Sequence, residues 1–310
     1  MASKSVTFGL MADIHHDLVP DAPIRLQAFI DRMNELRVDF IIQLGDFCFP
    51  TEHNRDFLAI WESFDGPKYH VLGNHDMDIC DKQSMMDYLG MPFPYYSFDC
   101  GGLHAVVLDG NNLLQEGAYV DYAFRNYSGK PDAINYLTDE QLSWLRADLA
   151  DTDKPVILFS HQSLEDPHHG KNVGIRNSEK LRAVLREANE RAGYRKVIAC
   201  LNGHNHVDGV KVIDDIYFMH VNSMSYYYMG PEINIVRYSE ALTKQYPILA
   251  ESAPYLDPLY AVVTVDPVGT LRIEGRTSEW VGPSPVESGH GNVAAGHLIV
   301  PKISDRRLLF

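Results

Sequence analysis

The stretch Phe8-Gly9-Leu10-Met11-Ala12-Asp13-Ile14-His15 joins an apolar run to two side chains of the kind that bind metals. A strand that is buried on both faces is apolar throughout, as in the parallel strands of α/β proteins. Polar residues at the carboxyl ends of such strands meet in one crevice. This stretch therefore predicts a buried strand that delivers Asp13 and His15 to a site at the edge of a sheet.

Four more runs repeat this pattern along the chain. They are Phe40–Leu44 before Gly45-Asp46, Tyr69–Leu72 before Gly73-Asn74-His75-Asp76, Val156–Phe159 before Ser160-His161, and Val197–Leu201 before Asn202-Gly203-His204-Asn205-His206. If the strands lie in sheets with their carboxyl ends together, these scattered Asp, His and Asn side chains converge. The sequence therefore predicts one candidate metal site.

Helix-like segments alternate with these strands. Apolar residues recur at helical spacing in four segments, which are residues 23–36, 54–64, 138–149 and 178–191. Three strand pairs with short turns indicate hairpins, at residues 95–100 with 103–108, 210–213 with 216–221, and 260–265 with 270–274. We therefore expect an α/β protein with a mixed sheet, or a pair of sheets, flanked by helices.

Two segments lack a regular pattern. Residues 111–133 are rich in Tyr, Asn and Gly and are interpreted as an insertion that covers the crevice as a lid. Residues 282–310 contain several Pro and Gly and are interpreted as an extended C-terminal arm, which leaves residues 1–281 as the main domain. The arm either packs on its own domain or exchanges with a second copy to form a homo-oligomer.

Composition and charge narrow the class of protein. The 310 residues carry a formal charge of −15 without a basic stripe, which argues against a nucleic acid polymer as partner and leaves small phosphorylated molecules. No apolar run approaches the roughly 18 residues of a membrane span, and the start lacks the regions of a secretory signal. The 4 cysteines form no CxxC pair. We therefore expect a cytoplasmic protein with no membrane partner and no zinc–cysteine site.

The order D-x-H, G-D, G-N-H-D, H and G-H-x-H, from Asp13 to His206, resembles the calcineurin-like metallophosphoesterase family. One such piece alone is common, whereas all five in this order after apolar strands are specific. The resemblance implies a four-layer α/β (α+β) sandwich of two mixed β-sheets flanked by helices. It also implies a dinuclear metal site at the carboxyl ends of the strands, in a catalytic domain over residues 1–281.

The resemblance also implies a role for each motif residue. It assigns the first metal to Asp13, His15 and His206, the second metal to Asn74, His161 and His204, and the bridge between them to Asp46. His75 corresponds to the catalytic histidine, which is not a ligand. Imidazole and carboxylate ligands suit Mn, Fe or Zn. Two such cations, roughly 3.5–4 Å apart, can clamp an in-line displacement at phosphorus and turn a shared water into hydroxide.

Two departures from related branches affect this assignment. Phe49 stands where purple acid phosphatases have a tyrosine on iron, so a purple ferric site is not expected. Ser/Thr protein phosphatases have an aspartate at that position to orient the catalytic histidine, which leaves Asp76 or a backbone carbonyl for this task. The pattern is most similar to the branch of cyclic-nucleotide phosphodiesterases and manganese-dependent ADP-ribose pyrophosphatases.

Residues near the motifs are candidates for substrate binding. The candidates are His16, Asn74, His168, His169, Arg176 and Tyr226. A tyrosine can stack on a nucleobase, and an arginine can bind a second phosphate. For each residue except Asn74, the alternative is an ordinary role in a loop or in packing.

The prediction is a dinuclear-metal-dependent phosphoesterase. It hydrolyses phosphodiester or pyrophosphate bonds of small molecules by attack of a metal-bridging hydroxide. A phosphomonoesterase is the alternative with the same chemistry, and a non-catalytic metal-binding scaffold is the alternative from another class. The intact His75 and the full set of ligands argue against the scaffold.

Overall fold

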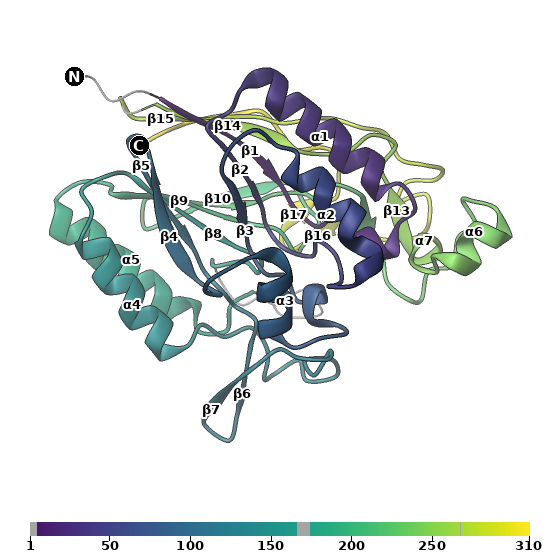
Figure 1. Ribbon diagram of the computed structural model, residues 1–310, viewed down its shortest axis with the longest axis horizontal. Helices are drawn as coiled ribbons and strands as arrows, with labels where there is room; N and C mark the ends of the chain where they lie inside the picture. The colour runs from purple at the N-terminus through teal and green to yellow at the C-terminus, as the bar shows by residue number, and fades with distance from the viewer. Residues whose placement is uncertain (1–4, 166–173, 267) are drawn as a thin grey trace.

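Two six-stranded β-sheets face each other in the computed structural model, which describes residues 5–165, 174–266 and 268–310 (Figure 1). The first sheet contains, in spatial order, β18 (Arg306–Leu309), β15 (Thr270–Glu274), β14 (Ala261–Asp266), β1 (Val6–Met11), β2 (Phe40–Gln43) and β3 (Lys68–His70). The second contains β10 (Gly209–Ile213), β11 (Ile216–His220), β9 (Val197–Asn202), β8 (Val156–Ser160), β5 (Leu103–Val107) and β4 (Tyr96–Cys100). Each sheet combines parallel and antiparallel pairs. The predicted sandwich of two mixed sheets is confirmed.

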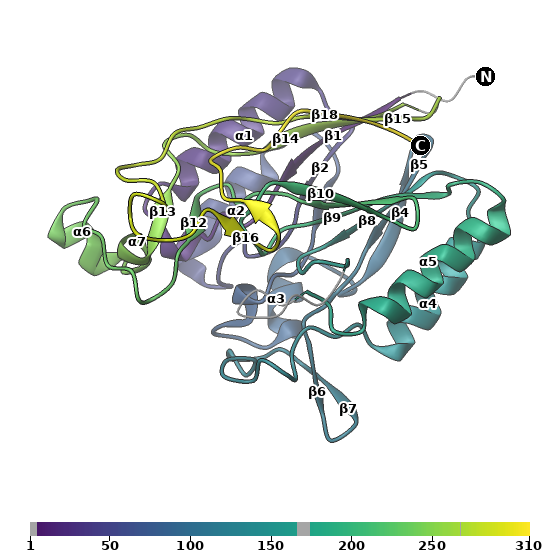
Figure 2. The ribbon, with the colours of Figure 1, turned by 180° about the vertical axis from the view of Figure 1, so that it is seen from behind.

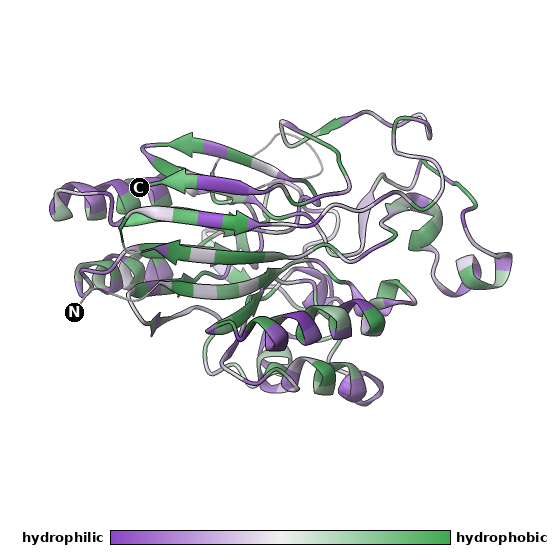
Figure 3. Cartoon of the chain, turned by 90° about the horizontal axis from the view of Figure 1, so that it is seen from above, coloured by the Kyte–Doolittle hydropathy of each residue, from purple (hydrophilic) through white to green (hydrophobic). Residues whose placement is uncertain are grey.

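Apolar side chains from both sheets form the central core. Phe8 of β1 stacks on Phe40 of β2 with 4.6 Å between ring centroids, and it meets Phe159 of β8 edge-on at 5.7 Å. All three rings are fully buried, and burying a side chain of this size contributes roughly 1.5–3 kcal/mol. β1, inside the first sheet, is mostly apolar, whereas β15, one strand from its edge, alternates polar and apolar residues, and Figure 3 shows strands of both kinds. This contrast explains why the inner strands gave the clearest sequence signal.

Helices cover the outer face of each sheet (Figure 1). On the first sheet, α1 (Ala22–Leu36) and α2 (Arg55–Glu62) pack in one apolar cluster, in which Phe29 and Trp61 stack at 6.3 Å. On the second sheet, α4 (Asp139–Ala150) and α5 (Ser178–Ala192) pack against β8 and β9. The Thr138 side chain caps α4 by accepting the backbone N–H of Gln141. Among the described residues, no helix combines the length and apolar character that a membrane crossing requires.

Shorter elements complete the chain. They are α3 (Lys82–Leu89), β6 (Asn112–Gln115), β7 (Ala118–Asp121), β12 (Tyr226–Tyr228), α6 (Glu240–Gln245), α7 (Ile248–Glu251), β13 (Ser252–Pro254), β16 (Val293–Ala294), β17 (His297–Leu298) and 3-10 turns at His16–Leu18, Glu52–Asn54 and His75–Met77. The first half of the 111–133 insertion is thus a regular hairpin, β6–β7, which projects from the body of the molecule (Figure 1).

The C-terminal segment lies along its own chain (Figure 2). β16 and β17 pair as a short hairpin, and β18 then joins the edge of the first sheet, with Leu309 opposite Thr270 of β15. The apolar residues at the end of the chain therefore have an intramolecular partner. Exchange of this arm between subunits stays a prediction.

Candidate metal centre

Loops at the carboxyl ends of five strands hold the predicted ligands. Five of these residues have left-handed backbone, namely Asp13, His15, Asp46, His204 and His206, with φ between 50° and 67°. Such conformations cost about 1–3 kcal/mol each and persist where the surroundings enforce them. The loops after β1 and β2 are joined directly, because Asp13 N–H donates to Gly45 O at 3.1 Å and His15 N–H to Asp46 O at 3.0 Å. The left-handed backbone of these loops therefore directs the side chains of the predicted ligands toward the same site.

Two glycines allow the loops after β2 and β3 to meet. A Cβ on Gly73 would lie 2.1 Å from the backbone nitrogen of Asp46, and one on Gly45 would lie 2.6 Å from the Gly73 nitrogen. Gly45 also has a φ of 94°, which favours glycine. The Gly of each motif is therefore a requirement of close packing around Asp46.

The first ligand group contains Asp13, His15 and His206. Their ligand atoms lie within 4.8 Å of one another, with Asp13 Oδ1 at 3.3 Å from His206 Nε2. The two Nε2 atoms of His15 and His206 are 3.2 Å apart. His206 Nδ1 donates to the carbonyl of Tyr226 at 2.7 Å, which leaves its Nε2 to face the group.

The second group contains Asn74, His161 and His204. His161 Nε2 lies 3.1 Å from both Asn74 Oδ1 and His204 Nδ1. His161 Nδ1 donates to the carbonyl of Leu44 at 2.8 Å, and this hydrogen bond directs its Nε2 toward the other two residues of the group. The amide of Asn74 is oriented too, because its Nδ2 donates to Tyr127 Oη at 3.3 Å.

Asp46 stands between the two groups. Its Oδ2 is 3.3 Å from His161 Nε2 and 3.7 Å from His15 Nε2. Its Oδ1 accepts the backbone N–H of His75 at 2.8 Å, which fixes the plane of the carboxylate. One oxygen is thus placed to contact a cation in either group.

Protonation states of the groups fit bound cations. Burial lowers the pKa of His15 and of His204 to about 3, so both present neutral nitrogens. Burial opposes ionisation of Asp46, but His161 and His75 hold its pKa well below the usual value. Despite burial, Asp46 raises the pKa of His161 to about 9. The ring is therefore protonated in the absence of metal, and it releases this proton when a cation binds. Carboxylates, an amide oxygen and imidazoles are ligands for first-row divalent metals.

His75 lies beside these groups with an aspartate on its far nitrogen. Its Nδ1 donates to Asp78 Oδ2 at 2.9 Å, and Tyr127 Oη, from the 111–133 insertion, donates to Asp78 Oδ1. The His75 side chain is 32% exposed, whereas that of Asp78 is 10% exposed. Burial opposes the charged ring, but Asp46 and Asp78 raise the pKa of His75. The open Nε2 of His75 is therefore suited to give a proton to a bound molecule.

Residues 6–208 match the sequence pattern of the calcineurin-like phosphoesterases, and these residues contain every ligand and His75. The chain belongs to this family. Membership makes the protein a metal-dependent phosphoric ester hydrolase with a dinuclear centre, and it confirms the family resemblance that the motifs indicated.

Three relatives are informative about this calcineurin-like phosphoesterase. It is 26% identical to a manganese-dependent ADP-ribose/CDP-alcohol diphosphatase of Oryza sativa subsp. japonica, over 66% of this chain and 79% of that protein. It is 23% identical to the Arabidopsis thaliana protein of the same description, over 70% and 85% of the two chains. A solved dimetal phosphatase from Danio rerio has the same fold, with a TM-score of 0.62, 16% identity and coverage of 90% of this chain and 99% of that one.

The carboxylate beside His75 is a correction to the sequence-based assignment. Asp76 was one of two candidates for orienting this histidine, beside a backbone carbonyl, yet its carboxylate accepts the backbone N–H groups of Phe47 and Gly73, both at 2.7 Å. Residues three apart lie on the same side of a 3-10 turn, so the turn beginning at His75 presents Asp78 to it and points Asp76 inward. Burial and the charge of Asp46 raise the pKa of Asp76 to about 7. In this calcineurin-like phosphoesterase, Asp76 holds two ligand loops together.

The substrate-binding candidates lie in different surroundings. His16 stacks on Phe57 at 3.9 Å and lines a groove with His15, Phe49 and His75. Tyr226 is 2% exposed and packs on His15 at 5.2 Å, so its ring cannot receive a base. His16 therefore lies at the rim of the metal centre, whereas Tyr226 supports the predicted ligand His15 from behind.

Arg176 lies away from the metal centre. Arg176 donates to the carbonyl of Pro131 and lies 3.7 Å from Asp132, so it anchors the end of the insertion. His168 and His169 lie outside the described residues. Asn74 is therefore the candidate that the structure places within a ligand group.

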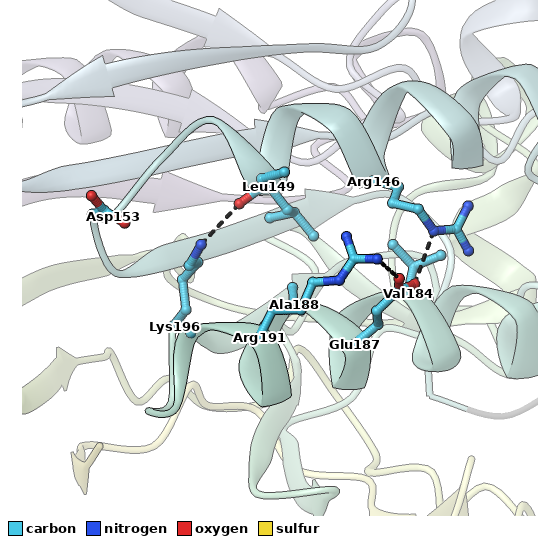
Figure 4. A pocket seen from close by; sticks show the side chains of 10 residues that line it. Arg146, Leu149, Asp153, Val184, Glu187, Ala188, Arg191 and Lys196 are labelled. Atoms are coloured by element: carbon cyan, nitrogen blue, oxygen red, sulfur yellow. Dashed lines mark hydrogen bonds and ion pairs between the residues drawn. The ribbon is translucent and has the colours of Figure 1, made fainter.

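A pocket between α4 and α5 is remote from this chemistry (Figure 4). Lys196, which donates to the carbonyl of Leu149 at 3.0 Å, directly precedes β9 and marks the amino ends of the strands. Arg146 and Arg191 both pair with Glu187 there, at 2.9 and 2.5 Å. The calcineurin-like site is at the opposite, carboxyl ends of these strands.

Proposed function

We propose that this protein hydrolyses pyrophosphate bonds of small nucleotide-like molecules at a dinuclear centre bridged by Asp46. The position of Asp46 Oδ2, within 3.3 and 3.7 Å of imidazoles from both groups, carries this proposal. The first group supplies Asp13, His15 and His206, and the second supplies Asn74, His161 and His204. The descriptions of both plant relatives support a diphosphate substrate and manganese as the metal.

The residues around the centre have separate roles in the reaction. Bound cations supply Lewis-acid stabilisation of the phosphoryl oxygens and lower the pKa of a coordinated water. His75, kept protonated by Asp46 and Asp78, donates its Nε2 proton to the leaving oxygen. Tyr127 holds both Asp78 and Asn74 through its hydroxyl, so the proton donor and a ligand share one support. Burial of the ligands excludes bulk water from the cations.

A substrate competition tests the bond class. With manganese-loaded protein, we expect kcat/KM for ADP-ribose or a CDP-alcohol to exceed that for p-nitrophenyl phosphate by at least about 10²-fold. This difference corresponds to roughly 2.7 kcal/mol of additional transition-state stabilisation. One water cleaves the pyrophosphate into two phosphomonoesters, which can be separated and quantified by anion exchange.

Other outcomes would favour the alternatives. A higher kcat/KM for p-nitrophenyl phosphate indicates a phosphomonoesterase, and a higher value for bis(p-nitrophenyl) phosphate indicates a simple phosphodiesterase. No turnover of any of these substrates with Mn, Fe or Zn supplied separately favours the non-catalytic scaffold.

Asp78→Asn is expected to move the alkaline limb of the kcat–pH profile to lower pH. His75 acts in its protonated form, and Asp78 is one of the groups that raise its pKa, so activity is lost as pH rises through that pKa. Removing the charge lowers the pKa and brings this loss to a lower pH. We also expect kcat at neutral pH to fall about tenfold, since hydrogen bonds to charged groups contribute about 1.5–3 kcal/mol.

Asp87→Asn is the matched control, because Asp87 pairs with Gln83 on the exposed face of α3. Its profile should coincide with that of the unmodified protein. An alkaline limb that does not move in Asp78→Asn would show that Asp78 has no influence on the catalytic proton.

A further inference from the structure

We propose that Glu165, His220 and His297 form a third divalent-cation site, suited to zinc, outside the dinuclear centre. The three residues come from distant segments, because Glu165 follows β8, His220 ends β11 and His297 begins β17. Their ligand atoms lie within 4.8 Å of one another. Glu165 is 0% and His220 2% exposed, and His297 is half-buried. Two imidazoles and one carboxylate are a ligand set found in zinc enzymes, with water in the fourth position.

The spacing of this group matches that of the dinuclear centre. Glu165 Oε1 lies 3.3 Å from His220 Nε2, and two carboxylate–imidazole contacts of the dinuclear centre, Asp13–His206 and Asp46–His161, have the same length. The His220 and His297 rings have centroids 4.9 Å apart, as do His161 and His204. Zinc ligands at about 2.0–2.2 Å from the metal are roughly 3.3 Å from each other in a tetrahedron. The Glu165–His220 distance is therefore that expected between two zinc ligands, and all three ligand atoms lie within 4.8 Å of one another.

The fold makes room for the histidine that the C-terminal arm contributes. A Cβ on Gly209, the first residue of β10, would lie 2.3 Å from the His297 ring. The ring thus occupies space that any other residue at position 209 would fill. Figure 2 shows the hairpin that carries it, in yellow, beside the end of β10. The packing of the His297 ring against Gly209 therefore holds this part of the arm beside β10.

An asparagine of the last motif can direct His220 toward a cation. Asn205 Nδ2 lies 3.1 Å from His220 Nδ1, while Asn205 Oδ1 is buried and has no hydrogen-bond partner in the part of the chain that the structure describes. Asn202 Nδ2 also lies 3.2 Å from His220 Nδ1 and donates to Gly203 O at 2.8 Å. Turning the Asn205 amide lets its Oδ1 accept the Nδ1 proton while Asn202 keeps its bond to Gly203, which leaves His220 Nε2 for the metal. Because Asn205 stands between His204 and His206, the third site shares a loop with the dinuclear centre.

Among the described residues, Lys211 is placed to compete with a cation for the carboxylate of Glu165. Its Nζ lies 2.9 Å from Glu165 Oε1, and its side chain is 39% exposed. The ammonium balances the buried carboxylate while no metal is bound, and it can move into solvent when a cation takes its place. Removing this charge should therefore strengthen metal binding, a result that a purely structural salt bridge would not give.

Zinc stoichiometry tests the proposal on the full chain. After equilibrium dialysis against zinc and elemental analysis, we expect His297→Ala to bind one zinc ion fewer than the unmodified protein. We expect Lys211→Gln to bind that additional ion about tenfold more tightly, a change of roughly 1.4 kcal/mol. His290→Ala, on the same arm and in contact with Tyr227, is the control and should bind the full number.

The zinc measurements test the third site independently of catalytic activity. Equal zinc content in His297→Ala and the unmodified protein would overturn the third site, whatever the activity. Unchanged affinity in Lys211→Gln would overturn the part of the proposal in which the Lys211 ammonium and the cation exclude each other. Because the readout is a difference between variants, an error in the dinuclear assignment leaves it intact. A zinc-dependent rise in Tm for His290→Ala that exceeds the rise for His297→Ala would separate loss of the site from loss of the fold.

Discussion

Replacing His75 with alanine is expected to lower kcat for ADP-ribose by about 10²–10⁴-fold, the usual contribution of a general acid. KM and the manganese content should change little, because the hydrogen bond from His75 to Asp46 is made by its backbone N–H, which alanine keeps. With bis(p-nitrophenyl) phosphate the loss should be smaller, since p-nitrophenolate leaves without a proton. Steady-state kinetics on both substrates, with metal analysis of each preparation, measure these effects.

His53→Ala is the matched control, because His53 is an exposed histidine in the 3-10 turn before α2. It should keep full activity. An equal loss on both substrates in His75→Ala would mean that His75 acts on the transferred phosphoryl group instead of the leaving oxygen. A parallel loss of manganese would make it a ligand or a support for one.

The ligand set could be predicted from sequence because each ligand immediately follows an apolar strand. Asp13 and Asp46 follow the parallel neighbours β1 and β2, and His161 and His204 follow the parallel neighbours β8 and β9, so the carboxyl ends within each pair lie together. The two parallel strand sets lie in different sheets, and their meeting at one edge depends on how the sheets pack. The motif order supplied that information through the family, whereas periodicity alone did not.

The partner of His75 could not be predicted in the same way. The choice between Asp76 and Asp78 depends on the 3-10 turn at His75–Met77, and no sequence pattern indicated this turn. Tyr127 comes from the 111–133 insertion, where no periodic pattern indicated which residue returns to the site. Contacts between a loop and a distant turn are set by packing, so local pattern carries little information about them.

Glu165, His220 and His297 were missed for a related reason. Their meeting depends on the register of β11 beside β9, which sets His220 opposite Asn202, and on the fold of the arm. A single histidine at the end of a hairpin strand is an ordinary sequence feature. Only the three-dimensional structure relates it to residues 55 positions earlier and 77 positions later.

Asp46→Asn is expected to remove most of the bound manganese and to lower kcat/KM by about 10³-fold. The Asp46 carboxylate lies between imidazoles of both groups, so its negative charge reduces the repulsion between the two cations. Losing several kcal/mol of stabilisation corresponds to a factor of this order. Asparagine tolerates the left-handed backbone at this position, where φ is 54°, and its amide oxygen can still accept the His75 N–H. The substitution therefore removes the negative charge of the side chain and nearly preserves its shape. Elemental analysis measures the bound manganese, and steady-state kinetics measure kcat/KM.

Asp56→Asn is the control for the loss of one acid, because Asp56 is exposed in the first turn of α2. It should bind manganese and turn over substrate like the unmodified protein. Asp46→Ala adds backbone strain at the same φ, since alanine disfavours the left-handed region. If Asp46→Asn lost metal and Asp46→Ala also lowered Tm in metal-free protein, charge and backbone would be separable contributions. Full manganese binding by Asp46→Asn would contradict a bridging role, because neutral asparagine cannot offset the repulsion between neighbouring cations.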